Sequence, residues 1–288
     1  MTAPQDDGTP QDAPLGAPTH PAPDTQVQTF PASGPLDVRV NLDYGLVRVT
    51  ARSTTTATLR ATAVIGSRPQ DVEAAQNVRI SLVGDVLDVR GAASGWRRFV
   101  RPGAAEIALE VPEGSRLTVT TGYAEVEVAG PVGRCAVRST GGDIRVEEAA
   151  NAQLETKYGS VMVDRLSDGG SAESTHGTVR VRQTAGITQL GGSSGDVLLD
   201  RATGDLTLRN TYGAVKVGEL VSGTCTVTTS YGAVEVGIPT GTAAYLDLRS
   251  DHGRVRSDLD RTSEPTADAE RATVRARTSY GEITIRRS

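Results

Sequence analysis

A short motif that recurs along the second half of this chain limits its possible folds more than any other feature. Each copy begins with an aromatic or small residue. In most copies a glycine follows, and then branched residues alternate with others, as in the segment Tyr-Gly-Ala-Val-Lys-Val that begins at Tyr212. Successive copies lie 18, 17, 18, 18, 18, 19, 21 and 28 residues apart. The regular period predicts a solenoid in which each repeat forms one coil. The glycine position falls at Ala124, Gly142, Gly159, Gly177, Gly195, Gly213, Gly232, Gly253 and Gly281.

Each repeat contains two short segments with the alternation of a strand. One follows the glycine, as in Val215 and Val217, and the other precedes the next motif, as in Cys225 and Val227. Coils stacked at about 4.8 Å pair each strand in parallel with the strands above and below. The sequence therefore predicts an all-β protein, a parallel β-solenoid with two strands in each coil of about 18 residues. We expect the corner glycines to supply the positive φ of a tight turn.

The repeat places small polar residues in one inward column, two positions before the aromatic residue of each motif. We expect their side chains to hydrogen-bond along the column and so to satisfy their own buried polarity. The members of this inward column are Thr121, Ser139, Thr156, Ser174, Gly192, Asn210, Thr229, Ser250 and Thr278.

The aromatic position of the motif forms a second column at one corner of the coil. Because solenoid corners commonly stack like residues, we interpret it first as a structural ladder that covers the coil edge. Its second interpretation is a binding strip. The column comprises Tyr123, Gly141, Tyr158, His176, Ser194, Tyr212, Tyr231, His252 and Tyr280, and the candidate binding residues are Tyr158, His176, Tyr212, Tyr231, His252 and Tyr280.

Outward positions after the glycine alternate in charge between neighbouring coils. Glu127 is expected beside Arg145, and Lys216, Glu235 and Arg256 are expected on successive coils. Charge pairs of this kind contribute about a few tenths of a kcal/mol each on a solvated face. We interpret them as surface pairing and not as a ligand site.

Residues 28–112 are expected to form a β-rich cap over the open end of the solenoid, which then occupies 113–288. The cap begins with a repeat-like unit at 38–49 and a strand near 57–65, and ends with a hairpin around Gly84 and a strand at 105–112. Residues 67–77 predict one short helix with Ser67 as its N-cap. Residues 95–104 predict a basic loop, and 256–272 a charged loop inserted before the last coil. Residues 1–27, rich in Pro, Asp and Gln, predict a disordered tail.

Composition narrows the class of partner. A net charge of −5 argues against nucleic acid, which requires a basic face. No apolar run is long enough for a transmembrane segment, and the first residues lack the basic and apolar regions of a signal peptide. The sequence predicts a cytoplasmic protein, or one peripheral to a membrane, that binds a protein or a component of the cell envelope.

The motifs and spacings of common active sites are missing from the sequence. Asp143 and Asp196 share a column but lie three coils apart, about 14 Å, which is too far for the carboxyl pair of a glycosidase. Gly-Asp corners are too few for a calcium-binding repeat. His176 and His252 are expected four coils apart, about 19 Å, and cannot share a metal. We therefore predict no catalytic residue, no cofactor, no metal site and no enzymatic activity.

The two cysteines, Cys135 and Cys225, begin inward-alternating strands in nearly the same column. Five coil steps separate them, about 24 Å, whereas a disulfide requires Cα atoms within about 7 Å. Both are predicted to be free, buried thiols of low reactivity.

The segment Val-Pro-Glu-Gly-Ser-Arg at 111–116 and the Tyr-Gly-x-Val-x-Val units that follow resemble a bacterial adhesin-like repeat family of unknown function, domain of unknown function 4097. The resemblance covers about residues 28–288. It implies a β-solenoid without catalytic residues, an adhesin-like role, or a link to the response to cell-envelope stress.

Two functional hypotheses follow. The first is a non-enzymatic solenoid that presents its flat sheets and its corner strip to a partner. The second is a carbohydrate-binding or polysaccharide-active β-helix with its site at Tyr158, His176, Tyr212 and Tyr231. Rings that point into a groove beside carboxylates would favour the second hypothesis, and rings packed on the coil edge would favour the first.

Overall fold

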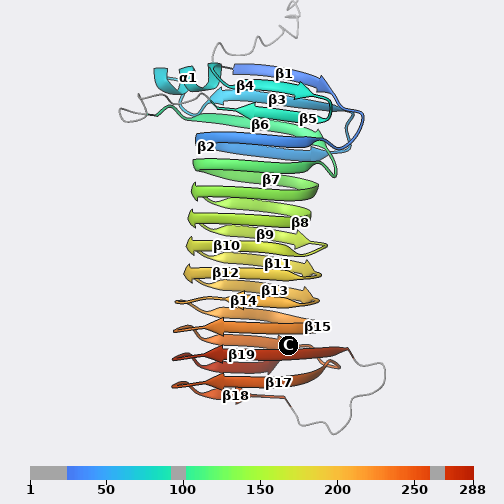
Figure 1. Cartoon of the computed structure of the whole chain (residues 1–288), viewed down its shortest axis with the longest axis vertical. Helices are drawn as coiled ribbons and strands as arrows, with labels where there is room; N and C mark the ends of the chain where they lie inside the picture. The colour runs from blue at the N-terminus through green and yellow to red at the C-terminus, as the bar shows by residue number, and fades with distance from the viewer. Residues whose placement is uncertain (1–24, 92–101, 260–269) are drawn as a thin grey trace, which may run out of the picture.

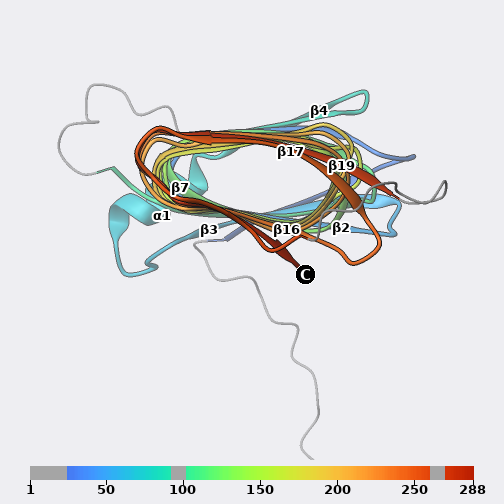
Figure 2. The same cartoon turned by 90° about the horizontal axis from the view of Figure 1, so that it is seen from below.

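The computed structural model describes residues 25–91, 102–259 and 270–288. The strands stack into one long array, with a group of further strands and a helix at one end (Figure 1). Seen along the stack, the coils superimpose as a flattened oval (Figure 2). Neighbouring coils pair in parallel, as β10 does with both β8 and β12. The predicted parallel β-solenoid is confirmed.

The oval has two long sides, which we call side A and side B. Four long strands run around a corner and contribute to both sides: β2 (Asp37–Arg52), β7 (Arg116–Gly141), β8 (Ile144–Tyr158) and β15 (Val215–Thr229). The remaining strands of side A are β10 (Gly170–His176), β12 (Thr188–Ser194), β14 (Leu206–Arg209), β17 (Ala243–Ser250) and β19 (Arg271–Thr278). Those of side B are β9 (Val161–Leu166), β11 (Val179–Ala185), β13 (Val197–Thr203), β16 (Val234–Ile238), β18 (Val255–Ser257) and β20 (Ile283–Arg287).

Alternation along each strand fills the narrow interior with aliphatic side chains. On side B, Val161, Val179 and Val197 follow one another in register, and all are buried. On side A, Leu154 and Leu190 lie above and below Ala172 in the same way. Medium-sized branched residues suffice because the oval is flattened and inward side chains from both sides share its narrow interior.

The inward polar column is mostly buried, with Gly192 and Ser250 only partly so, but its hydrogen bonds differ from the prediction. Most of its side chains bond to the backbone of the corner and not to one another, and the buried hydroxyl of Thr121 has no hydrogen-bond partner among the described residues. Ser174 Oγ donates to the carbonyl of Gly159 at 2.7 Å, and Asn210 Nδ2 donates to the carbonyls of Gly195 and Tyr212 at 2.9 and 3.0 Å. A tight turn leaves carbonyls without strand partners, and these short side chains supply the missing donors.

The corner glycines serve two different purposes. Gly159 has a φ of 139°, and a Cβ there would lie 2.3 Å from the carbonyl oxygen of Gly142. Gly232 has no positive φ, contrary to the prediction for every corner, and the same holds for Gly253 and Gly281. A Cβ at Gly232 would nevertheless lie 1.7 Å from the carbonyl oxygen of Gly213. Close stacking of corner backbones therefore requires glycine even where the dihedral angle does not.

The N-terminal end carries a small group of elements over the first coils. Strand β2 is itself a coil of the stack, because Tyr44 and Gly45 lie in register with Tyr123 and Ala124 of β7. On side B it is followed by β6 (Ala105–Pro112), β3 (Thr56–Ala63) and β1 (Thr25–Pro31), of which β3 and β1 pair antiparallel. On side A the predicted hairpin, β4 (Arg79–Val83) and β5 (Val86–Arg90), pairs with β2.

Helix α1 (Pro69–Gln76) lies in the predicted segment, but Ser67 is not its N-cap. Arg68 holds that position and makes no capping hydrogen bond with its side chain. Asp71 is fully buried instead, and its carboxylate accepts the backbone N–H groups of Ile65 at 3.2 Å and Ala104 at 3.0 Å. The helix is thereby tied to the chain on both sides of it. The basic loop predicted at 95–104 lies mostly outside the described residues, as does most of the loop at 256–272.

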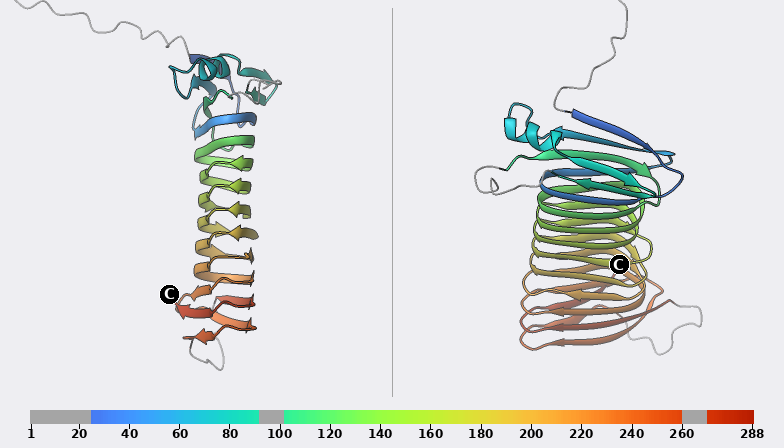
Figure 3. Two further views of the ribbon diagram at one scale, coloured as in Figure 1. Left: turned by 90° about the vertical axis from the view of Figure 1, so that its left-hand side faces the viewer. Right: turned by 45° about the horizontal axis from the view of Figure 1, so that its top comes forward.

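The last coils do not stack in the order of the sequence. Strand β19 pairs with β15 on one edge and with β17 on the other. Likewise β20 lies between β16 and β18. The coil at 271–287 is therefore inserted between its predecessors, and β17 with β18 forms the end of the stack (Figure 3). The prediction that residues after 272 form the terminal coil was wrong, because the repeat spacing carries no information on which neighbours pair.

Candidate functional site

The aromatic column forms a ladder at one corner of the solenoid. Tyr212 and Tyr231 stack with ring centroids 5.0 Å apart and planes 7° from parallel. Tyr280 stacks on Tyr231 at 5.2 Å, and His252 stacks on Tyr280 at 4.8 Å. His252 thus ends the ladder beyond Tyr280, because the last coil in the sequence is inserted before it. Four rings in a row make this the longest continuous part of the ladder.

The ladder has two interruptions, at Gly141 and Ser194. Tyr158 stacks on His176 at 5.1 Å, and Tyr44 on Tyr123 at 5.8 Å. At Gly141 the neighbouring ring leans into the gap, since a Cβ there would lie 2.7 Å from Cδ1 of Tyr123. At Ser194 the residues in register on either side are His176 and Tyr212, and no ring contact joins them.

Ladder tyrosines are half exposed although their faces are stacked. Tyr158, Tyr212 and Tyr231 have exposed fractions of 55%, 54% and 54%. Stacking covers both ring faces of Tyr231 and one ring face each of Tyr158 and Tyr212, and it leaves the ring edges exposed. The structure therefore places all six predicted strip residues in one column at the surface, and groups them as Tyr158 with His176 and as the four-ring row.

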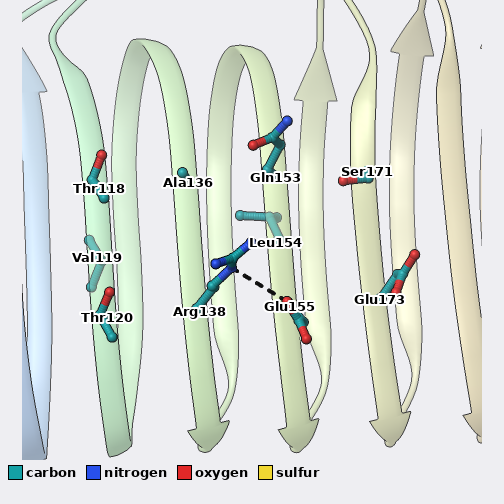
Figure 4. A pocket seen from close by; sticks show the side chains of 10 residues that line it. All are labelled: Thr118, Val119, Thr120, Ala136, Arg138, Gln153, Leu154, Glu155, Ser171 and Glu173. Atoms are coloured by element: carbon teal, nitrogen blue, oxygen red, sulfur yellow. Dashed lines mark ion pairs between the residues drawn. The ribbon is translucent and has the colours of Figure 1, made fainter.

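A second feature is a shallow hollow of about 440 Å³ on side A, near the N-terminal end of the stack (Figure 4). Outward side chains from four neighbouring coils line it, among them Thr118, Arg138, Glu155 and Glu173. Glu155 and Glu173 lie directly opposite each other in adjacent parallel strands. Sequence analysis missed this carboxylate pair because it considered only the aspartates after the corner glycines.

The two glutamates turn away from each other. Glu155 forms an ion pair with Arg138 at 3.5 Å on one side. On the other side Glu173 leans over Gly191, where a Cβ would lie 3.3 Å from its Cγ. Both side chains face solvent on an open sheet. Catalytic carboxyl groups usually lie in an enclosed pocket, whereas this pair lies on an open, solvated sheet.

The aspartates after the corner glycines are used to join coils. Oδ1 of Asp143 accepts the backbone N–H of Ser160 at 2.8 Å, and Oδ1 of Asp196 accepts that of Ala214 at the same distance. Asp205 accepts the N–H of Thr224 in the same manner. Within the described residues no group of three or more metal-binding side chains gathers at one place. His176 and His252 lie five coil steps apart, one more than predicted, because of the inserted coil.

Charged residues on side B form pairs across neighbouring coils. Glu127 lies between Arg48 at 3.0 Å and Arg145 at 3.5 Å, which confirms the predicted Glu127–Arg145 pair. The hydrogen bond from Arg48 to Glu127 raises the pKa of the guanidinium. Because these charges are paired and solvated, they offer no concentrated field for a ligand.

The predicted row of Lys216, Glu235 and Arg256 was wrong in its last step. Thr284 of the inserted coil lies between Glu235 and Arg256. Glu235 pairs with Lys216 at 3.7 Å and with Arg286 at 2.7 Å, and the hydrogen bond from Arg286 lowers the pKa of the Glu235 carboxyl.

Cys135 and Cys225 are buried and free. Their strands are joined by the register Cys135–Ala152–Gly170–Thr188–Leu206–Cys225, which is five coil steps. Burial raises the pKa of each thiol to about 12. Neither thiol is placed or activated for chemistry.

Solved structures with a similar arrangement carry names that suggest adhesion or lipid binding. A "putative adhesin" from Parabacteroides distasonis is 11% identical, with a TM-score of 0.46 and coverage of 92% of this chain and 97% of that chain. A "putative adhesin" from Bacteroides fragilis is 10% identical, with a TM-score of 0.43 and coverage of 93% and 99%. A "putative lipid binding protein" from Parabacteroides distasonis is 11% identical, with a TM-score of 0.42 and coverage of 92% and 96%.

No curated protein matches the sequence. None of the described helices has the length and apolar character needed to cross a membrane. The Toastrack model, DUF4097, matches residues 39–286, which include every coil of the stack. This chain therefore belongs to the Toastrack DUF4097 family.

Proposed function

We propose that this protein is a non-enzymatic interaction module and that its contact surface is the aromatic ladder, Tyr158, His176, Tyr212, Tyr231, His252 and Tyr280. The observation that carries the proposal is the four-ring row, in which each ring is held by its neighbours and still half exposed. Ordered tyrosines lose little conformational entropy on binding, and they combine an apolar ring with a hydroxyl group. The partner is a protein or a component of the cell envelope.

The rigidity of the support adds to this proposal. The tyrosines of the row project from coils that are paired on both sides, so their spacing is fixed before a partner arrives. A preorganised surface binds more tightly than one that must be ordered on contact. The solvent-exposed pair Glu155 and Glu173, and the aspartates that already accept backbone hydrogen bonds, offer no comparable support for catalysis.

A carbohydrate ligand is the second candidate, and one observation favours it. Sugars bind to free aromatic faces, and most ladder faces are covered by another ring. At Gly141 the ring of Tyr123 leans into the gap, but at Ser194 His176 and Tyr212 face each other across a coil that contributes no ring. Binding of an oligosaccharide there would be lost in a Ser194→Tyr variant, which completes the ladder, whereas a protein contact along the row would persist.

The test of the main proposal compares capture of partners by two variants. The first carries Tyr212→Thr, Tyr231→Thr and Tyr280→Thr, and the second carries Ile187→Thr, an apolar residue of 69% exposure outside the ladder. Capture from native cells, followed by mass spectrometry, should give a protein or envelope component that the control retains and the triple variant loses. Circular dichroism checks that both variants remain folded. Equal capture by both variants would contradict the proposal.

Three expectations from the sequence accompany the proposal. They are a cytoplasmic or membrane-peripheral location, no nucleic-acid partner, and a link to adhesion or envelope stress. The paired charges of side B support the second of these, since nucleic acid requires unpaired basic residues on one face.

A further inference from the structure

The C-terminal end of the stack presents an unpaired sheet edge. In the described part of the chain, β17 pairs only with β19 and β18 only with β20, so the outer edge of both strands is free (Figures 1 and 3). At the opposite end β1 and β4 also pair on one edge only among the described residues, but there helix α1 packs against β1, β3 and β6. The two ends of the solenoid therefore differ.

The core is also open at this end. Leu246 and Leu248 point inward from β17 but are only partly buried, whereas Leu206 and Leu208 of β14 are fully enclosed. Val255 of β18 is 45% exposed. A free edge beside uncovered aliphatic side chains is a template for a further strand. Strand β17 has no proline and no inward charge, the usual features that prevent such pairing.

We propose that a second copy of this chain binds at this edge, with the two β17 strands antiparallel about a two-fold axis at Leu248. In this register Leu248 faces its own copy, and Asp247 faces Arg249 of the other chain, twice. A two-fold axis perpendicular to the sheet leaves inward side chains inward and outward side chains outward. Both sheets and the core therefore continue into the second copy.

Charge selects this register over its neighbours. A two-fold axis at Asp247 would place two aspartates opposite each other, and an axis at Arg249 would do the same with two arginines. Opposite charges across an antiparallel pair stabilise it, while like charges destabilise it. Within one chain Arg277 pairs with Asp247 at 2.8 Å, and Arg249 pairs with Asp251 at 3.2 Å. In the proposed register Asp247 of the second chain would join Asp251 beside Arg249.

The first experiment measures mass in solution by light scattering across roughly a hundredfold dilution series. The full chain of 30.0 kDa should run as a dimer at the upper concentrations. Arg249→Asp should give a monomer, and the charge exchange Asp247→Arg with Arg249→Asp should restore the dimer. Arg182→Asp changes the net charge equally, on an interior coil where Arg182 pairs with Asp164, and should leave the dimer intact.

The second experiment tests the register. Antiparallel neighbours have Cα atoms about 4.5–5.5 Å apart, within the range for a disulfide. Leu248→Cys should therefore form a dimer on a non-reducing gel under mild oxidation, and Ala244→Cys should not. A monomer at every concentration, as expected if another segment of the chain covers the edge, would overturn the proposal. So would a dimer that Arg249→Asp leaves unchanged. The proposal does not depend on the aromatic ladder.

Discussion

Replacing one ladder tyrosine tests whether stacking between coils stabilises the solenoid. Tyr231 has two ring neighbours, Tyr212 and Tyr280, while Tyr158 has one, His176. Their exposed fractions, 54% and 55%, are almost equal, so the loss of buried area on truncation to alanine is matched. An aromatic pair contributes about 0.5–1.5 kcal/mol beyond its buried area. Tyr231→Ala should therefore cost about 1 kcal/mol more than Tyr158→Ala.

Urea denaturation followed by far-ultraviolet circular dichroism measures the free energy of unfolding. A double-mutant cycle measures the interaction energy between two rings. It should be about 0.5–1.5 kcal/mol for Tyr212 with Tyr231 and near zero for Tyr158 with Tyr231. Ile187→Ala is the control for an exposed apolar side chain outside the ladder. Equal costs for Tyr231 and Tyr158, together with no coupling, would refute the reasoning.

Three further predictions concern the core, the corners and the fold. Cys135 and Cys225 should resist Ellman's reagent until denaturant is added and should then titrate as two thiols. Burial raises the pKa of each thiol from 9.0 to about 12, so the unfolded chain loses these protons first and the free energy of unfolding falls between pH 9 and 12, by about 1.4 kcal/mol per pH unit for each thiol. The fall should be less steep in a Cys135→Ala, Cys225→Ala variant. Gly142→Ala should cost at least about 3 kcal/mol in urea denaturation, because its φ is 112° and a Cβ would lie 2.3 Å from the carbonyl oxygen of Ala124, whereas Gly84→Ala has open space and should cost less. Circular dichroism of residues 28–288 should show a helix content well below roughly a quarter, and a higher value would contradict the solenoid.

The fold could be predicted because a repeat constrains many residues at once. A period near 18 residues with two alternating segments fixes which side chains enter the core, as at Val215 and Val217. The partners of the inward column could not be predicted, because the carbonyls that Ser174 and Asn210 reach belong to corner backbone whose orientation the alternation does not define. The same limit applies to Glu155 and Glu173, which become neighbours only once the exact register is known.

For the aromatic ladder too, residue spacing predicts some features, and the pairing of the coils determines the others. The column could be predicted from spacing, and so could its position at a corner. Which rings touch could not, because the order of the last coils depends on pairing between distant segments. Tyr280 lies between Tyr231 and His252 only because β19 and β20 are inserted there.

That insertion has a consequence for the order in which the solenoid can fold. Residues 243–257 come before 271–287 in the sequence, although the later segment separates them from the rest of the stack. While residues 271–287 are not yet in place, β17 must either pair directly with β15 or remain unpaired. In the first case β19 and β20 must displace a formed pairing, and in the second the edge of β15 remains exposed until they bind. Folding of this solenoid therefore cannot proceed by simple addition of coils in sequence order, because residues 271–287 enter between two coils that precede them in the sequence.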